Sequence, residues 1–341
     1  MKINDFDFQL PEELIAQKPA HPRDTCRLMV LNPKKKKIGH YKFTDLTCFL
    51  KKSDVLVFNN SKVFPARLQF THHGKRIELL LTKKIDDNKW LAIGKPGKFL
   101  QPGKIFTLQK NLTVEIVNIL KDGQKTLSFS KSGKELEKLL EKLGRPPFPP
   151  YIKNESISLE EYQTVYAKIK GSVAAPTAGL HFTESLLKKL RERGIETIFA
   201  TLHVGLGTFL PIRAENIENH LMHSEWYNID SKSTDALNKA KKEHRRIIAV
   251  GTTALRVLET CFDEKRGFLA GFGETSIFIY PGYKWKCTDG LITNFHLPKS
   301  TLFLLVCAFA ETKFIHKAYK EAIKKLYRFY SFGDAMLILK R

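Results

Sequence analysis

The chain has 341 residues, of which 43% are hydrophobic and 27% are charged, as in an ordinary soluble globular protein. Its start is acidic and polar and lacks the pattern of a secretory signal, and its longest apolar run, 302–310, is too short to span a bilayer. Five scattered cysteines without a C-x-x-C spacing argue against a disulfide framework and a thiolate metal site, so we expect a cytoplasmic protein.

The formal net charge of +22 comes from 57 basic and 35 acidic residues. A polyanionic partner such as RNA would explain it, because lysine and arginine contacts to phosphates release counterions. However, 43 of the basic residues are lysines and 14 are arginines. Arginine is the better residue for bidentate phosphate recognition. A lysine excess is also typical of solvated side chains in a lysine-biased proteome, so charge alone leaves both explanations open.

The first 130 residues have the texture of β-structure. Runs 27–32 and 38–43 predict a hairpin with a basic tip, and the apolar run 54–58 predicts a buried strand. From about residue 63 to residue 130, short apolar runs alternate with turn residues, which predicts a small antiparallel barrel or sandwich. The predicted strands in this part are 77–81, 90–93, 105–108, 112–120 and 126–129.

A helix and a stiff connector are expected next. The Ser132-x-x-Glu135 spacing is that of a capping box, and Gly144 would end the helix. Four prolines between Pro146 and Pro150 then predict an extended connector. Beyond it, strand-like and helix-like segments alternate, which is typical of an α/β domain. These segments are 195–204, 235–245, 247–250, 254–261, 276–280, 291–295 and 314–327.

This order of segments predicts an α/β protein of two domains. We expect a larger, discontinuous mixed α/β catalytic domain of residues 1–61 and 150–341. A small all-β barrel-like domain, residues 62–149, would be inserted into it and end in the helix and the proline-rich connector.

The stretch 171–183, GSVAAPTAGLHFT, places small residues directly before a predicted helix. Thr183 is a suitable N-cap, and Gly194 is a suitable stop. Small residues at this place let backbone N–H groups approach an anionic or carboxylate group closely. The same residues would also suit a buried loop that only requires tight packing, and the spacing matches no phosphate-binding loop.

Two further glycine-containing segments follow predicted strands. Gly205-x-Gly207 has Leu210 where the third glycine of a dinucleotide fingerprint would stand, so we reject that fingerprint and the standard methyltransferase fold. The two glycines would bring the backbone close to a ligand or make a tight turn. Gly251-Thr252-Thr253 lies between a buried strand and a helix, where a hydroxyl would contact a ligand or cap the helix.

The segment His220-x-x-His223-x-Glu225 has the spacing of metal ligands but lacks a further ligand pattern, so no metal is predicted. A plain histidine pair and a role in proton transfer both remain open. Aromatic and basic residues are interleaved in 280–286 and 327–330. Such segments read single-stranded RNA bases by stacking, although half of such rings are ordinarily buried in a core.

Motifs along the whole chain resemble one family. They include GSVAAPTAGLHFT at 171–183, LITNFHLPKST at 291–301 and YRFYSFGDAM at 327–336. The remaining motifs are 5–11, 15–17, 22–24, 57–60, 65–67, 149–152, 162–167, 202–209, 220–225, 250–253 and 279–283. In this order they resemble the S-adenosylmethionine:tRNA ribosyltransferase-isomerases of queuosine biosynthesis.

The resemblance implies an enzyme that acts on tRNA carrying 7-aminomethyl-7-deazaguanine at the wobble position of the anticodon loop. It would transfer and isomerise the ribosyl moiety of S-adenosylmethionine onto the aminomethyl nitrogen, giving epoxyqueuosine-tRNA and releasing adenine and methionine. S-adenosylmethionine would be consumed as a co-substrate, with no prosthetic group. We expect a monomer without a membrane partner.

On this resemblance we assign the candidate site residues. Catalytic proton transfer is predicted for His181, His203, His223 and Glu225. Binding of the co-substrate is predicted for Pro176, Thr177, Gly179, Gly205, Gly207, Thr252 and Thr253. Substrate binding is predicted for Arg67, Asn294, His296 and Asp334.

The sequence departs from the family pattern at Asn60-Ser61-Lys62, where an Asp-Thr-Arg run is usual. Substrate affinity would change if these residues bind substrate, and nothing would change if they only shape a turn. Two other classes of function remain open. One is an RNA methyltransferase, against which the missing glycine fingerprint argues, and the other is an inactive RNA-binding protein.

Overall fold

The structure is a computed structural model that describes residues 1–154, 156–205, 212 and 214–340. The chain divides into two compact units. The first contains Met1–Lys62, Pro150–Ile169 and Ala175–Arg341, and the second contains Val63–Pro149 and Lys170–Ala174. The division into a catalytic and an inserted domain stays a prediction, because compactness does not show that either part folds by itself.

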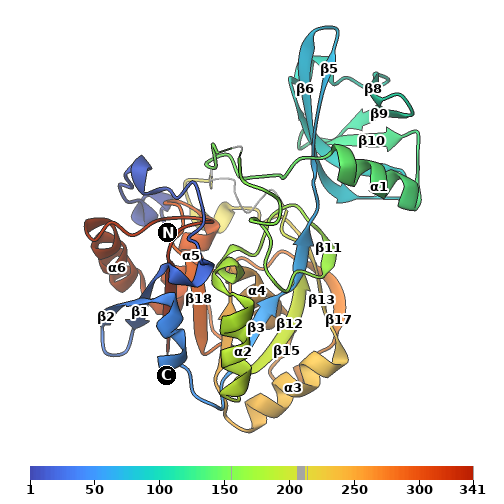
Figure 1. Ribbon diagram of the computed structural model, residues 1–341. Helices are drawn as coiled ribbons and strands as arrows, with labels where there is room; N and C mark the ends of the chain where they lie inside the picture. The colour runs from blue at the N-terminus through green and yellow to red at the C-terminus, as the bar shows by residue number, and fades with distance from the viewer. Residues whose placement is uncertain (155, 206–211, 213, 341) are drawn as a thin grey trace. The chain divides into compact units, whose positions relative to one another are not determined.

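The first unit is built on a nine-stranded sheet with the order β17-β13-β12-β3-β14-β18-β19-β1-β2 (Figure 1). Its strands are β1 (Arg27–Asn32), β2 (Lys37–Lys42), β3 (Val55–Asn59), β12 (Glu196–Leu202), β13 (Glu225–Ile229), β14 (Ile247–Val250), β17 (Gly271–Thr275), β18 (Gly290–Asn294) and β19 (Ala335–Leu339).

The central strands β12, β3, β14 and β18 are parallel to one another, whereas β19 runs antiparallel to β18. Every residue of β3, β14 and β18 is buried, because helices and loops cover both faces of the sheet. The carboxyl ends of the four parallel strands therefore meet at one edge, where binding sites of α/β sheets lie.

The helices of this unit connect the strands. They are α2 (Glu184–Glu192), α3 (Ser231–Lys242), α4 (Thr252–Cys261), α5 (Thr301–Ala310) and α6 (Thr312–Lys324). Short 3₁₀ helices are η1 (Ile3–Phe6), η2 (Glu12–Leu14), η3 (Arg23–Thr25), η4 (Phe43–Cys48), η6 (Thr177–His181) and η8 (Ile217–Asn219). In Figure 1, α2 covers one face of the sheet and α4 covers the other.

Alternate residues of the central strands make the core beneath α2. Leu56 and Phe58 of β3 and Val250 of β14 pack in one cluster with Leu186 and Leu190 of α2. As predicted, Thr183 caps this helix by accepting a hydrogen bond from the N–H of Leu186 at 3.1 Å. Gly194, with φ 75°, follows its end. The cap and the apolar stripe therefore fix α2 against the sheet.

The second unit is an antiparallel six-stranded sheet with the order β5-β6-β7-β10-β9-β8, which closes almost into a barrel. Its elements are β5 (Arg67–His72), β6 (Lys75–Lys84), β7 (Lys89–Lys95), η5 (Gly97–Phe99), β8 (Ile105–Gln109), β9 (Leu112–Ile119), β10 (Lys125–Phe129) and α1 (Gly133–Leu143). Two short sheets complete the described strands, one of β4 (Ser61–Val63) with β11 (Ile169–Ser172) and one of β15 (Phe262–Asp263) with β16 (Gly267–Phe268).

The predicted fold class, α/β with an all-β barrel-like part, is confirmed. Two local predictions differ from the structure, and several strands were not predicted. The helix α1 forms, but the Ser132 side chain makes no cap, and Glu135 pairs with Lys131 at 2.8 Å instead. The segment 276–280 is not a strand; β17 ends at Thr275, whose hydroxyl accepts the N–H of Ile277. The sequence also did not predict strands β4, β5, β11, β13, β15, β16, β17 and β19.

The apolar run 302–310 lies in α5. Every helix within the described part of the chain is too short or too polar to traverse a lipid bilayer.

Candidate active site

A cavity lies in the first unit, where β14 and β18 end. It encloses about 650 Å³ of space not filled by atoms, its open mouth included. Its described lining residues come from the residue after the proline-rich connector, the segment before η6 and the start of η6, the chain after β12, the starts of α4 and α5, the end of β18 with the residues after it, and the loop before β19. They are Tyr151, Ala175, Pro176, Thr177, Ala178, Val204, Gly251, Thr252, Thr253, Thr293, Asn294, Phe295, His296, Leu297, Ser300, Leu302, Tyr330 and Ser331. Six of the predicted site residues therefore share this cavity: Pro176, Thr177, Thr252, Thr253, Asn294 and His296.

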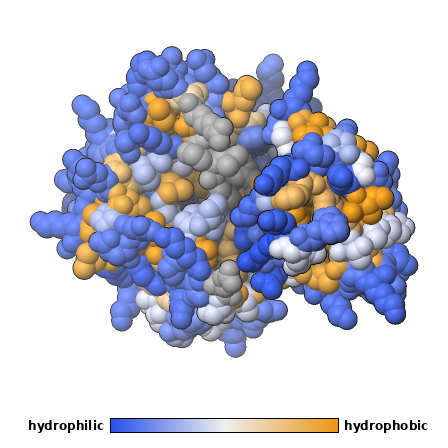
Figure 2. All heavy atoms as spheres, turned by 90° about the horizontal axis from the view of Figure 1, so that it is seen from above, coloured by the Kyte–Doolittle hydropathy of each residue, from blue (hydrophilic) through white to orange (hydrophobic). Residues whose placement is uncertain are grey.

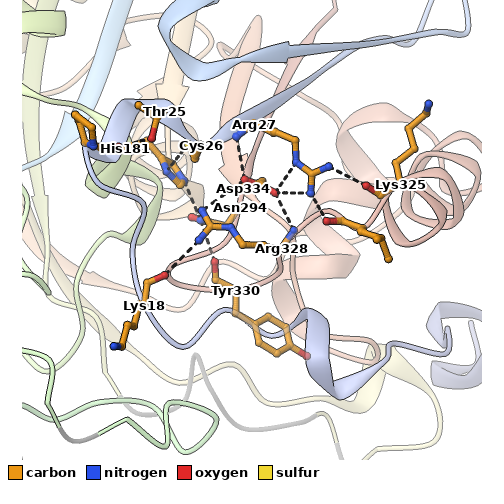
Figure 3. A network of polar contacts seen from close by, with 12 residues as sticks. Lys18, Thr25, Cys26, Arg27, His181, Asn294, Lys325, Arg328, Tyr330 and Asp334 are labelled. Atoms are coloured by element: carbon orange, nitrogen blue, oxygen red, sulfur yellow. Dashed lines mark hydrogen bonds and ion pairs between the residues drawn. The ribbon is translucent and has the colours of Figure 1, made fainter.

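Asn294, at the end of β18, is held by three neighbours, of which Figure 3 shows His181 and Tyr330. Its amide Nδ2 donates to the carbonyl oxygen of Tyr330 at 3.0 Å and lies 3.0 Å from Nε2 of His181. Its carbonyl Oδ1 accepts a hydrogen bond from the hydroxyl of Thr177 at 3.1 Å. The contact with a backbone carbonyl fixes which end of the side chain is the amide nitrogen. One face of the cavity is thus pre-organised by β18 and η6.

This network also assigns the proton of His181. Because the Asn294 amide donates to Nε2, that nitrogen is unprotonated, and the proton of the neutral ring lies on Nδ1. Nδ1 lies 3.2 Å from Sγ of Cys26. Burial, with contributions from Arg328 and Arg23, lowers the pKa of His181 to about 3. The neutral imidazole uses both nitrogens inside the protein and is not a lining residue, so it positions Asn294.

Asp334 is a structural anchor for the loop before β19. Its buried carboxylate accepts the backbone N–H of Arg27 at 2.9 Å and of Arg328 at 2.8 Å, and the Nε of Arg27 donates to it at 3.2 Å (Figure 3). The side chain is 2% exposed and is absent from the described cavity lining. It holds the backbone on either side of Tyr330, which has φ 69° and lines the cavity.

His296 is the single histidine among the described residues of the cavity lining. Its Nε2 lies 2.7 Å from the hydroxyl of Thr293, and its backbone N–H donates to the hydroxyl of Tyr319. Burial lowers its pKa to about 3. The ring is therefore neutral at physiological pH and able to exchange hydrogen bonds with a bound ligand.

Two predicted residues lie near the lining residue Val204: His203 directly follows β12, and Glu225 begins the neighbouring strand β13. The ring of His203 stacks on Trp226 with 4.8 Å between centroids, and burial lowers its pKa to about 4. Glu225 accepts the N–H of Gly205 at 2.8 Å and forms a buried ion pair with Arg256 of α4. With both carboxylate oxygens engaged, Glu225 fixes the strand end instead of facing a ligand in this structure.

Two predicted site residues, His223 and Arg67, have other surroundings. His223 is exposed, and His220 packs its ring on Phe278 at 5.3 Å between centroids. Within the described ranges, no three His, Cys, Asp or Glu side chains are arranged to hold a metal ion. Arg67 belongs to the second unit, where its guanidinium donates to the carbonyl of Phe148 at 2.8 Å. Gly207 and Leu210 lie outside the described residues.

Gly179 is required by packing. A Cβ atom there would lie 1.9 Å from the hydroxyl oxygen of Tyr166. Asn60, in the segment that departs from the family pattern, accepts the hydroxyl of Thr201 at 2.7 Å and bonds the backbone of Lys168 and Ile169. These contacts favour a structural role for Asn60.

The rings expected to stack on RNA are largely part of the fold. Tyr327 is 1% exposed, with the Arg27 guanidinium 4.1 Å from its ring centroid. Trp285 donates its Nε1–H to the carbonyl of Ala308. Hydrophilic residues cover most of the face seen in Figure 2, and hydrophobic ones appear in separate patches. Any RNA contact of that face would therefore use mainly polar and charged side chains.

Sequence reasoning did not assign several residues of this site. Cys26 contacts Nδ1 of His181. In the cavity lining, the hydroxyl groups of Tyr151 and Ser331 lie 2.8 Å apart and share a hydrogen bond. Tyr330 and Ser300 also line the cavity. The motif 327–336 contained the signal for Tyr330 and Ser331, because it resembles the family over its full length.

Comparison with known proteins identifies the family. Residues 3–338 match the family model described as Queuosine biosynthesis protein. The chain is 51% identical to proteins named S-adenosylmethionine:tRNA ribosyltransferase-isomerase from Thermoanaerobacter sp. (strain X514) and Halothermothrix orenii, over 99% of this chain and 100% of each relative.

A crystal structure of S-adenosylmethionine tRNA ribosyltransferase from Thermotoga maritima is 36% identical, with a TM-score of 0.57, over 98% of this chain and 100% of that one. Since the family model spans nearly the whole chain and relatives share half of its residues, the chain belongs to the S-adenosylmethionine:tRNA ribosyltransferase-isomerase family of queuosine biosynthesis enzymes.

Proposed function

We propose that this enzyme transfers and isomerises the ribosyl moiety of S-adenosylmethionine onto 7-aminomethyl-7-deazaguanine at the tRNA wobble position. The products would be epoxyqueuosine-tRNA, adenine and methionine. The observation that carries the proposal is the 51% identity, over the full length, to enzymes named for this activity. The protein would act as a monomer, which light scattering of the purified chain tests directly.

The cavity supports this proposal because it offers polar groups within a largely apolar wall. The reaction requires a base for the proton beside the sulfonium, hydrogen bonds for the departing adenine and exclusion of water. Thr177, Thr252, Thr253, Asn294 and His296 supply hydroxyl, amide and imidazole groups in this wall. We assign S-adenosylmethionine to this cavity.

The roles divide between residues that touch the ligand and residues that position them. His296 and Asn294 would contact the reacting groups, with His296 the candidate for proton transfer. Three residues would act indirectly. His181 would position Asn294, Asp334 would position Tyr330, and Glu225 would position Gly205. Pro176 and Thr177 would bind the co-substrate, with Gly179 and Gly205 behind them. His203, His223, Gly207 and the tRNA contact of Arg67 stay predictions.

The test is to incubate the protein with S-adenosylmethionine and tRNA carrying the aminomethyl base, and to measure adenine and methionine by mass spectrometry. Equal release of both, dependent on the modified tRNA, is expected. Unmodified tRNA is the matched control. S-adenosylhomocysteine together with methylated tRNA would establish a methyltransferase instead, and tRNA binding without consumption of the co-substrate would establish a binding protein.

The candidate base is tested separately. His296→Gln keeps a hydrogen-bonding side chain of similar length but cannot carry a proton at neutral pH, so kcat should fall by at least about 100-fold. Retention of near-native kcat would exclude His296 as the base while leaving the reaction itself intact.

A further inference from the structure

The first turn of α4 opens on the cavity without a cap. Gly251, the N-cap, has φ 91° and no side chain that could accept the N–H groups of the first turn. Thr252 and Thr253, the first two residues of this ten-residue helix, both line the cavity. Free N–H groups and the positive end of the helix dipole make such a turn attractive to an anion.

A second observation points to a missing ligand. Thr253 is only 8% exposed, and its buried hydroxyl has no hydrogen-bond partner among the residues that the structure describes. A buried hydroxyl without a partner costs free energy, and native proteins rarely leave one unsatisfied. Because Thr253 is a lining residue, an acceptor in the cavity would satisfy it.

The neighbouring helix α5 adds to the positive electrostatic potential in the cavity but does not add free N–H donors. Ser300 and Leu302, at the start of α5, also line the cavity, so two helix N-termini meet there. However, Ser300 caps α5 by accepting the N–H of Phe303 at 3.2 Å. The uncapped turn of α4 is therefore the better place for an anionic oxygen.

The described lining contains no Asp, Glu, Lys or Arg. Within this described lining, an anion would be held by N–H groups and hydroxyls and not by a counter-charge, and it would meet no acidic side chain. A flat, two-oxygen carboxylate suits a helix turn that offers adjacent N–H donors. S-adenosylmethionine has one such group, at its methionyl end.

We propose that the carboxylate of S-adenosylmethionine binds the first turn of α4, accepting hydrogen bonds from its N–H groups and from the Thr253 hydroxyl. This inference rests on the proposed function. The cationic sulfonium, two methylene groups further along the chain, then lies away from the helix end, which disfavours positive charge. Product methionine keeps the carboxylate, so it binds the same turn, whereas methioninamide does not.

The experiment compares S-adenosylmethionine with its decarboxylated form, which keeps the sulfonium, ribose and adenine. For the unmodified protein, kcat/KM for the decarboxylated compound should be lower by on the order of 100-fold. Thr253→Val should lower kcat/KM for S-adenosylmethionine by on the order of 10-fold and leave the decarboxylated compound unchanged, because that compound never used the hydroxyl.

Thr301→Val is the matched control. Thr301 begins α5, its buried hydroxyl also has no partner among the described residues, and it is absent from the described lining. This variant should leave the ratio of the two substrates unchanged. Thr253→Val should unfold at the same temperature as the parent protein or a higher one, because it removes an unsatisfied buried hydroxyl. A lower kcat/KM of Thr253→Val for S-adenosylmethionine could then not be explained by unfolding of the variant.

Equal kcat/KM for the two compounds would overturn the inference while the proposed function stands. So would an equal loss for both in Thr253→Val, or a rise of KM for tRNA alone, which would place a phosphate at the helix. If no adenine is released, the proposed function fails. Calorimetric binding of the two compounds then decides the inference by itself: tighter binding of S-adenosylmethionine supports it, and equal binding refutes it.

Discussion

Nε2 of His181 lies 3.0 Å from the amide nitrogen of Asn294, and this contact defines what the histidine can do. Asn294 donates to Nε2 and to the carbonyl of Tyr330, while its own carbonyl accepts from Thr177. The histidine is thereby a fixed acceptor behind the cavity wall. This geometry makes it a positioning residue.

We therefore predict that His181→Leu lowers kcat by about 10-fold, because the Asn294 amide loses one of its two acceptors and can reorient. The pH dependence of kcat should keep its shape, since His181 is neutral throughout the working range. Steady-state kinetics between pH 6 and pH 9 check this. Disappearance of the acidic limb of the profile would show that His181 is itself the base.

Buried His296 should make the protein sensitive to acid. Burial lowers its pKa to about 3 in the folded state, against about 6.5 in an unfolded chain. Between these values the unfolded chain binds a proton that the folded chain does not, so the free energy of unfolding falls as pH falls. The slope is at most about 1.4 kcal/mol per pH unit for this residue, and the effect vanishes above about pH 7.

His296→Gln should flatten this dependence between pH 6.5 and pH 4.5, as measured by urea unfolding at several pH values. His223→Gln, a substitution of an exposed histidine, is the control and should leave the slope unchanged. An unchanged slope in His296→Gln would mean that this ring is protonated in the folded protein.

The buried pair of Glu225 and Arg256 should contribute to stability mainly through the cost of breaking it. Their side chains are 3% and 4% exposed. Glu225→Gln leaves the guanidinium without its counter-charge, and the free energy of unfolding should fall by about 3 kcal/mol. The double variant Glu225→Gln with Arg256→Met removes the unpaired charge and should recover part of that loss. Denaturant unfolding of the single and double variants measures the coupling, and strict additivity would refute it.

Gly179→Ala should destabilise the protein by about 1–3 kcal/mol, because the added Cβ would lie 1.9 Å from the Tyr166 hydroxyl oxygen. Tyr166→Phe removes that oxygen, which has no partner among the described residues. Combining the two should restore much of the lost stability, as thermal unfolding would reveal. A double variant as unstable as Gly179→Ala would mean that the clash involves another group.

The sequence by itself determined the class of the protein. Periodic apolar runs and turn residues specified the hairpin of β1 and β2, the strands β6 to β10 and the capped helix α2, because these elements depend on local spacing and capping. The motifs, in their order along the chain, were sufficient to identify the family. Strands β13, β17 and β19 were missed because their assignment depends on partners distant in the sequence. Strand β5 was missed although it forms a hairpin with the neighbouring strand β6.

Only the tertiary structure decided which candidates share a site. Thr177, Thr252, Asn294 and His296 are up to 119 residues apart, counted from 177 to 296, yet they meet at one sheet edge because parallel strands end together. Sequence spacing could not show that Glu225 forms an ion pair with Arg256 or that His181 contacts Asn294. Such roles depend on burial and on hydrogen bonds between segments that only folding brings into contact.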